Sequence, residues 1–248
     1  MTATVDHSLM KLGRRAIKTD TRTLRVENYF SGSLPPPPES VTWSSKVCDW
    51  GMLLNDQLGD CTIAGALHLD MAWAANAGGI FVPTDNDALQ AYESIDGYQP
   101  GNPSTDNGGI LLNVLNAWRK TGIAGRKIAG YAMANIRNRT EIMQCINIFG
   151  GAYAAVMLPI SAQTQDVWSI VPDDGGVWGG HCVPILDYDE NGLTCITWGQ
   201  AKRLTWNFFD RYFDEFYPVV SQDFIEAGGV APNGFDLGQL TSDIALIH

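Results

Sequence analysis

The spacing of apolar residues predicts helices in the first half of the folded chain. Over residues 61–79, apolar side chains recur every three or four positions and the segment ends at a Gly-Gly pair, which predicts a helix that begins at Cys61. The same spacing predicts helices over 87–95 and 109–120.

Short runs of apolar or β-branched residues, which are typical of strands, occupy the second half. They cover 152–158, 182–188 and 193–198, and a polar turn at 189–192 joins the last two. Helical spacing returns over 205–217, where an aromatic stripe is interpreted as core. Helices followed by strands predict an α+β protein with a helical lobe and an antiparallel β-sheet lobe.

The sequence divides into an arm, a folded domain and a tail. The arm is basic and polar, and the four prolines that begin at Pro35 separate it from the domain. The tail is rich in glycine and asparagine, and we expect it to wrap around the domain. The expected bounds are 1–34 for the basic N-terminal arm, 35–220 for the domain (helical lobe about 41–125, β lobe about 126–220) and 221–248 for the C-terminal extension.

Charge is unevenly distributed between these parts. The formal net charge is −11, yet the arm carries six basic and three acidic residues and is therefore positive on an acidic protein. Because the arm and the domain carry opposite charges, we expect the arm to lie on the domain. A chain without clustered cations elsewhere disfavours nucleic-acid binding.

The composition, with 45% hydrophobic and 17% charged residues, is that of a globular protein. No run approaches the roughly 18 to 20 apolar residues of a membrane span, and the first residues lack the apolar core of a signal peptide. The five cysteines are odd in number and lack C-x-x-C spacing. We therefore expect a soluble, unsecreted protein, cytoplasmic or in another reducing compartment, with at least one free thiol.

Cys61 and His181 occupy positions that favour nucleophilic chemistry. The positive end of a helix dipole and a nearby imidazole both lower the pKa of a thiol. Cys61 lies in the first turn of a predicted helix, and His181 follows a Gly-Gly pair that leaves room for a substrate. His68 lies nearly two turns along the same helix, too far to reach Cys61, and is interpreted as structural. A lone cysteine is most often a small buried apolar residue, so the assignment needs further context.

Several segments, in the order of the chain, resemble motifs of the papain-like cysteine peptidases. They are SVTW at 40–43, NDQLGDC at 55–61, NGG at 107–109, VML at 156–158 with Trp168, HCVPILDY at 181–188 and WG at 198–199. The resemblance covers roughly residues 40–200, and the order and separation of the motifs make it specific.

The resemblance implies a two-lobed papain-like fold whose central helix begins at the nucleophile. It also implies a hydrolase that cleaves a peptide or amide bond through an acyl-enzyme, with Cys61 as the nucleophile and His181 as its partner. Gly108 and Gly109 correspond to the backbone that pairs with a bound peptide, and Trp198 to a hydrophobic wall over the histidine. The implied partner is a peptide or protein substrate, with no cofactor and no metal, and the oligomeric state stays open.

Two positions depart from the family pattern. Asn55 stands where the family has its oxyanion-hole glutamine; its amide can also donate to an oxyanion, and Gln57 is the alternative donor. Ile196 stands where an asparagine would orient the histidine. Thr197 could take that role through its hydroxyl, directly or through a water, if the strand is shifted by one residue.

The remaining cysteine and acidic motifs favour structural interpretations. The resemblance places a family disulfide at Leu58 and Asp106, and both cysteines are absent together, as a reducing compartment requires. Residues 187–192 fit half of a calcium loop, but the twelfth position is a tryptophan, so a hairpin turn is favoured. Cys182 and Cys195 are expected to be buried thiols, with a bridge between them left open.

Other functions remain open at this point. A catalytically silent papain-like fold that acts as a binding module is motivated by Ile196, and a related cysteine acyltransferase, amidase or leader-peptide peptidase could use the same scaffold. Gly108 and Gly109 could simply break the chain before a helix, and Trp198 could serve core packing. We further hypothesise that the basic arm covers the cleft between the lobes.

Overall fold

The computed structural model describes residues 6–29, 36–222 and 238. Most of the arm therefore lies within the described residues. The expected extension at 221–248 lies outside them, apart from its first two residues and Gly238.

Regular structure follows the expected order of helices and then strands. The helices of the described residues are α1 (Cys61–Asn76), α2 (Asp85–Asp96), α3 (Leu111–Lys120), α4 (Arg139–Phe149) and α5 (Trp206–Tyr212). The strands are β1 (Val41–Thr42), β2 (Ile128–Tyr131), β3 (Ala152–Pro159), β4 (Val167–Trp168), β5 (Val177–Asp189), β6 (Gly192–Thr197), β7 (Gln200–Thr205) and β8 (Phe213–Ser221). The three helices and three strands expected before residue 205 are confirmed, with ends that differ by a few residues.

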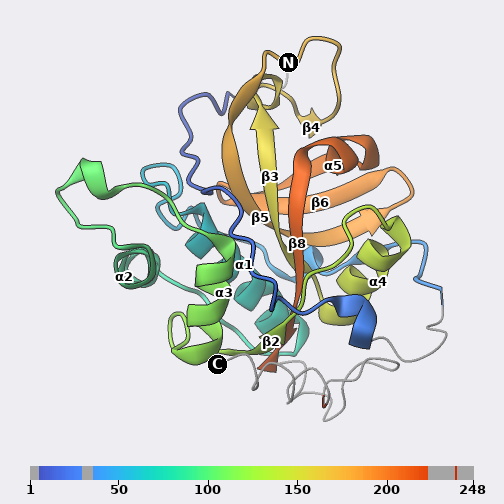
Figure 1. Cartoon of the computed structure of the whole chain (residues 1–248), viewed down its shortest axis with the longest axis horizontal. Coiled ribbons are helices and arrows are strands. Elements are labelled where there is room, and N and C mark those ends of the chain that lie inside the picture. The colour runs from blue at the N-terminus through green and yellow to red at the C-terminus, as the bar shows by residue number, and fades with distance from the viewer. Residues whose placement is uncertain (1–5, 30–35, 223–237, 239–248) are drawn as a thin grey trace.

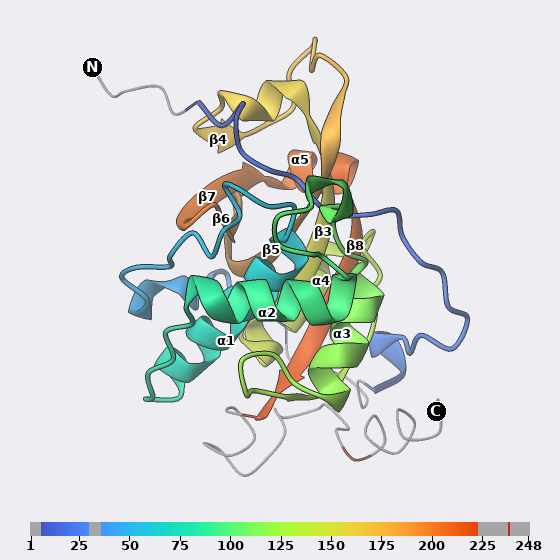
Figure 2. The same cartoon turned by 90° about the vertical axis from the view of Figure 1, so that its left-hand side faces the viewer.

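One mixed, mostly antiparallel sheet organises the molecule. Its strand order is β2-β8-β3-β5-β6-β7-β4, and β1 pairs with β5 away from this path. Of these pairs, β4 with β7 is parallel. Figure 1 shows α1, α2 and α3 on one side of the sheet and α4 and α5 on the other, and Figure 2 shows α2 running across the helical side. The α+β fold class and its two lobes are thus confirmed.

The central strands are buried on both faces, which explains their continuous apolar sequences. Tyr153 and Ala155 of β3 join the core formed with α1, α2 and α3. Ala154 and Val156 join the second core, which is formed with α4 and α5. Successive side chains of a strand point to opposite faces, so β3 belongs to both cores.

The central helix α1 is buried around its whole circumference. Every residue from Cys61 to Ala74 is buried, because α1 lies between β5 on one side and α2 and α3 on the other. Trp73 ties its C-terminal half to the end of α4 by donating to the carbonyl of Phe149 at 2.9 Å. Within the described part of the chain, no helix combines the length and apolar character needed to cross a membrane.

The helix expected over 205–217 is only half correct. The helix α5 ends at Tyr212, and Phe213 begins β8, which pairs with β3 and β2. Aromatic residues suit a strand as well as a helix, and the edge of β3 that β5 leaves free offers a ladder of backbone partners. Tertiary pairing therefore overrides the local helical spacing.

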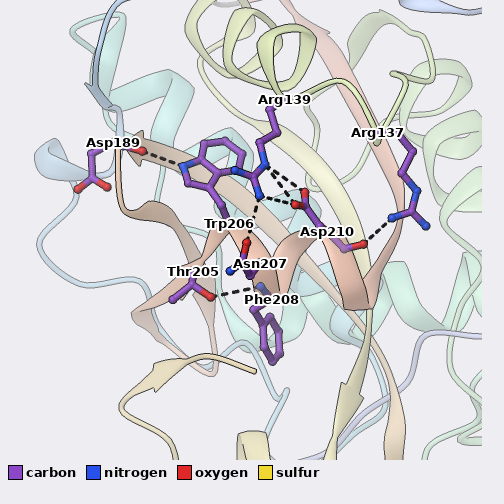
Figure 3. Close-up of polar contacts among 8 residues, drawn as sticks. All are labelled: Arg137, Arg139, Asp189, Thr205, Trp206, Asn207, Phe208 and Asp210. Carbon is purple, nitrogen blue, oxygen red and sulfur yellow. Dashed lines mark hydrogen bonds and ion pairs between the residues drawn. The ribbon is translucent and has the colours of Figure 1, made fainter. Parts of the chain in front are cut away.

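The short helix α5 is anchored at both ends of its sequence (Figure 3). Thr205 caps it, with Oγ1 accepting from the Phe208 amide at 3.2 Å. Arg139 at the start of α4 forms an ion pair with Asp210, and Trp206 donates to the carbonyl of Asp189 at 2.9 Å. These contacts hold α5 on the face of the sheet opposite to α1.

The acidic segment at 187–192 forms the expected hairpin turn. Asp189 pairs with Gly192 across the turn, and Oδ1 of Asp189 accepts from the amides of Asn191 and Gly192 at 2.9 and 3.0 Å. Arg203 forms an ion pair with the same carboxylate at 2.9 Å. The chain's own donors therefore occupy the oxygens that a calcium loop would present.

Shortening a side chain in α1 should destabilise the protein. We expect Ile63→Ala to lower the free energy of unfolding by about 2 to 5 kcal/mol, because Ile63 is fully buried and a cavity remains. The matched control is Ile80→Ala, since Ile80 is 92% exposed and should change the free energy by less than about 0.5 kcal/mol. Urea unfolding followed by tryptophan fluorescence measures both, and similar losses in the two variants would contradict the described core.

Candidate active site

Cys61 begins α1 and lies against the strand that carries His181. The backbone of Cys182 makes a hydrogen bond to the Cys61 thiol. The hydroxyl of Tyr153 donates to the carbonyl of Thr62 at 2.7 Å and holds the first turn of the helix on β3. Cys61 is only 1% exposed. The start of α1 is therefore fixed on the sheet, with the thiol next to β5.

His181 is fully buried and is held at one ring nitrogen and one ring face. Nε2 lies 2.7 Å from Oγ1 of Thr197. The imidazole stacks on the indole of Trp198, with ring centres 4.8 Å apart. Nδ1 is buried and has no hydrogen-bond partner among the described residues. Nδ1 is therefore the ring nitrogen left available for a further partner.

An irregularity in strand pairing accounts for the position of Thr197. Ile185 pairs with Cys195 but Asp187 pairs with Thr194, so β5 carries one extra residue between these pairs. A bulge of this kind shifts the register by one residue and exchanges the faces to which side chains point. Ile196 packs into the core of the helical lobe, whereas the hydroxyl of Thr197 meets His181.

Trp198 adopts a backbone conformation that is costly for a large residue. Trp198 and Gly199 form the turn between β6 and β7, with φ values of +46° and +73°. Such a φ persists in a bulky residue only where surrounding contacts enforce it. Here the indole packs on His181 and Trp178, and its Nε1 donates to the carbonyl of Lys11 at 3.2 Å. The strain is therefore located where the indole covers the histidine.

The amide of Asn55 is hydrogen-bonded within the loop that precedes Cys61. It donates to Oδ1 of Asp60 at 3.1 Å and to the carbonyl of Leu58 at 3.4 Å. Gln57, the alternative donor, is exposed. Burial raises the pKa of Asp60 well above its ordinary value, so the carboxyl next to Cys61 favours its neutral form.

The loop that contains Gly108 and Gly109 is tied to the loop before Cys61. Oδ1 of Asp106 accepts from the amide of Gly59 at 2.9 Å and from the hydroxyl of Tyr92 at 2.7 Å. The Tyr92 oxygen in turn accepts from the amide of Gly108 at 2.8 Å. The resemblance places a disulfide between these two loops, and a hydrogen-bonded carboxylate links them here.

The N-terminal arm lies between the two lobes, over the candidate nucleophile. The backbone of Gly13 makes a hydrogen bond to its thiol. The amide of Gly109 donates to the carbonyl of Gly13 at 2.7 Å, and the amide of Arg15 donates back to Gly109 at 2.8 Å. The amide of Arg14 donates to the carbonyl of Gly180 at 3.0 Å. Figure 1 shows this blue segment passing between the helices and the sheet, as the hypothesis of a covered cleft expects.

Glycines permit this close approach of three backbone segments. A Cβ built on Gly13 would lie 1.6 Å from the carbonyl oxygen of Gly59. A Cβ on Gly108, whose φ is +72°, would lie 1.8 Å from the carbonyl oxygen of Gly13. A side chain at position 13 is therefore incompatible with the arm in this place.

Burial holds both candidate catalytic groups in their neutral forms. It raises the pKa of the Cys61 thiol to about 12, although hydrogen bonds from the backbone of Cys182 and Gly13 act in the opposite direction. It also lowers the pKa of His181 to about 3, with a further contribution from the neighbouring charge of His7. At pH 7 the covered site holds a thiol and a neutral imidazole rather than an ion pair.

The other candidate residues have structural roles. Nε2 of His68 lies 3.1 Å from the carbonyl oxygen of Trp50, and burial lowers the pKa of His68 to about 4. All five cysteines are free thiols, so the bridge left open between Cys182 and Cys195 is absent. Across 6–29, 36–222 and 238, no three His, Cys, Asp or Glu side chains cluster in a way that could hold a metal ion.

A buried ion pair at the site was not expected from the sequence. Arg14 of the arm pairs with Glu215 of β8, at 2.6 Å. The two residues are 201 positions apart, and no local pattern links them. The only sequence signal was the opposite charge of the arm and the domain.

Comparison with solved structures identifies the fold. No protein-family model matches the chain, and no curated protein matches its sequence. Xylellain, a cysteine protease from Xylella fastidiosa, matches 86% of this chain over 97% of its own, with a TM-score of 0.65 and 14% identity. Digestive procathepsin L 3 of Tenebrio molitor matches 86% of this chain over 77% of its own, with a TM-score of 0.59 and 12% identity. The Carica candamarcensis cysteine protease CMS1MS2 matches 74% of this chain over 99% of its own, with a TM-score of 0.53 and 15% identity.

The chain therefore has the fold of the papain-like cysteine proteases, as the motif resemblance implies. At identities of 12% to 15%, what these similarities establish is the fold.

The covered thiol should be unreactive in the intact chain. At pH 8 we expect iodoacetamide to alkylate Cys61 at least about a hundredfold more slowly than Cys48, because Cys61 is buried with a raised pKa and Cys48 is exposed. Peptide mass spectrometry over a time course measures both thiols in one sample, so Cys48 is an internal control. Equal rates in the folded protein would show that the arm does not protect the site.

Proposed function

We propose that this protein is a cysteine-type peptidase that is latent while its arm lies over Cys61. The observation that carries the proposal is the state of His181. Its Nε2 is bound by Thr197, and its buried Nδ1 is unpartnered within the described residues, on the strand against which Cys61 packs. A histidine oriented at one nitrogen and free at the other is what thiol activation requires.

In the proposed reaction, proton transfer from Cys61 to His181 gives a thiolate and an imidazolium. The thiolate attacks the carbonyl carbon of a peptide or amide bond. The tetrahedral intermediate collapses, the carbon–nitrogen bond breaks, and the imidazolium gives its proton to the leaving amine. Water then gives a proton to His181 and attacks the thioester, which releases the acid and restores the thiol.

Two donors are proposed for the developing oxyanion. The backbone amide of Cys61 lies in the first turn of α1, where amides have no partner within the helix. Asn55 supplies the second donor, and its amide exchanges the acceptor on Asp60 or Leu58 for the oxyanion when substrate binds.

Thr197 and Trp198 are proposed to position the histidine. The Thr197 hydroxyl accepts from Nε2–H and fixes the tautomer with Nδ1 free for the thiol proton. The indole of Trp198 shields this hydrogen bond from water by stacking on the ring. Thr197 thereby takes the role that an asparagine has in the family.

The direction of the arm explains how it can lie over the nucleophile without being a substrate. Its earlier residues meet Trp198, on the leaving-group side, through Lys11 and His7. Its later residues pair in parallel with Gly109, on the acyl side. A substrate places its N-terminal half at Gly109, so the arm runs the opposite way.

Displacing the arm should activate Cys61. We expect Gly13→Val to expel the arm by steric clash and to raise the alkylation rate of Cys61 at pH 6 by at least tenfold. The reason is that hydration of the site lowers the thiol pKa and raises that of His181, so an ion pair forms. The same variant should hydrolyse peptides with a bell-shaped pH profile. Alkylation is followed by mass spectrometry and hydrolysis by a fluorogenic peptide panel.

The controls separate exposure from catalysis. Ala16→Val introduces the same side chain at an exposed position of the arm and should leave both signals at the level of the intact chain. Adding His181→Ala to Gly13→Val should remove the reactivity below pH 7, and adding Cys61→Ser should remove hydrolysis. If Cys61 becomes accessible but reacts only near pH 8.5, the binding-module alternative replaces the peptidase. Hydrolysis of non-peptide amides, with no hydrolysis of any peptide in the panel, favours the amidase alternative.

Loss of the Thr197 hydroxyl should affect turnover more than substrate binding. In the Gly13→Val background we expect Thr197→Val to lower kcat by about a hundredfold with little change in KM, because a misoriented imidazole transfers protons poorly. Thr197→Ser keeps the hydroxyl and should recover most of the rate. Unchanged kcat in Thr197→Val would exclude the positioning role.

A further inference from the structure

Arg14 fills a buried, acidic pocket beside the candidate nucleophile. One terminal nitrogen of its guanidinium lies 2.6 Å from Oε1 of Glu215 and 2.8 Å from Oδ1 of Asp214. The side chains of Arg14 and Glu215 are each 1% exposed, and that of Asp214 is 44% exposed. A residue of a separate surface segment thus reaches the interior and pairs with a carboxylate there.

The backbone of Arg14 lies where a bound peptide is expected. Arg14 forms a parallel bridge with Gly109, through the two hydrogen bonds of its neighbours, and its own amide donates to Gly180. The absence of a side chain at Gly180 makes room for the arginine, since a Cβ there would lie 3.0 Å from Cδ of Arg14. The pocket therefore opens directly beside the substrate backbone.

The acidic group is prepared by residues of the domain itself. The hydroxyl of Tyr217 donates to Oε2 of Glu215 at 3.0 Å, and both residues lie on β8 in the pairing with β3. Burial raises the pKa of Glu215 above its ordinary value even though Arg14 lies beside it. Without a cation beside it, a carboxylate buried in this position is costly to keep ionised. When the arm is displaced, the pocket therefore favours binding of another positively charged side chain.

A purely structural ion pair accounts for these observations less well. A buried ion pair anchors a segment no better than apolar side chains of similar volume would, and its advantage is selectivity. The neighbouring Arg15 is exposed, so the arm offers two arginines and the pocket takes one. The pocket therefore accepts the side chain of one position of the arm and not that of its neighbour.

We propose that the pocket filled by Arg14 is a cation-selecting subsite, and that substrates carry an arginine in the residue that pairs with Gly109. The inference rests on the proposed peptidase function for the identity of its ligand. The arm then holds the site closed by placing its own arginine in the substrate's pocket. Arginine is preferred to lysine because its guanidinium keeps its charge when buried.

Binding to an inactive chain tests the subsite without any need for turnover. The protein is the full chain with Gly13→Val and Cys61→Ala, and the probe is a fluorescent peptide of residues 8–18, measured by anisotropy. We expect Arg14→Leu in the peptide to weaken binding at least tenfold, and Arg14→Lys to weaken it less. Arg15→Leu, the matched control, should change the affinity by less than threefold.

A substitution in the protein tests whether Glu215 is the group that selects the cation. We expect Glu215→Gln to remove the tenfold preference for the original peptide over its Arg14→Leu form. Glutamine keeps the size of the side chain and can still accept from Tyr217. Loss of the preference supports the proposal, whereas an undiminished preference for arginine in Glu215→Gln overturns the assignment to this pocket.

Hydrolysis by the Gly13→Val chain separates the subsite from the catalytic proposal. Among peptides that differ at one position, we expect kcat/KM to be at least tenfold higher with arginine than with leucine, and the preference to disappear in Glu215→Gln. Turnover without this preference, together with equal binding of the two probes, overturns the subsite and leaves the peptidase. Selective binding with no hydrolysis of any peptide supports the pocket and overturns the peptidase.

Discussion

The packing of α1 against β5 is the contact on which the rest of the site depends. The helix is buried on all sides, so its first turn cannot move relative to the sheet. The hydroxyl of Tyr153 on β3 donates to the carbonyl of Thr62, and the backbone of Cys182 on β5 contacts the Cys61 thiol, so that turn is held on both strands. Cys61 and His181 are thereby carried on two regular elements that pack against each other. Rigid elements hold catalytic geometry better than loops do.

Burial of Cys61 and His181 decides their charge states. The same desolvation that raises the pKa of the Cys61 thiol lowers that of His181, so both groups are neutral at pH 7. The covering segment fits because Gly13 approaches Gly59 and Gly108 without a side chain on any of the three. In the proposed enzyme, latency would therefore depend on steric fit and water exclusion.

Two of the carboxyl groups whose pKa values are raised by burial lie near the candidate site. Burial raises the pKa of both Asp60, next to the nucleophile, and Glu215, beneath the arm. Buried acids reduce stability unless they are paired, and proteins keep such groups mainly at functional sites. In this molecule the cation that pairs with Glu215 comes from the N-terminal arm. The cost of that buried charge is thus coupled to the occupancy of the cleft.

The sequence by itself determined the features that depend on neighbouring residues. Apolar spacing and the Gly-Gly end are enough to predict α1, and motif order is enough to place Cys61, His181 and the papain-like fold. Tertiary structure decided what depends on pairing between distant segments. A bulge in β5 brings Thr197, and not Ile196, to His181. Pairing with neighbouring strands makes the residues after Tyr212 a strand, where the local spacing predicts a helix. The contact of Arg14 with Glu215 is likewise decided only when the arm folds back over the sheet, because no local interaction relates residues so far apart in the chain.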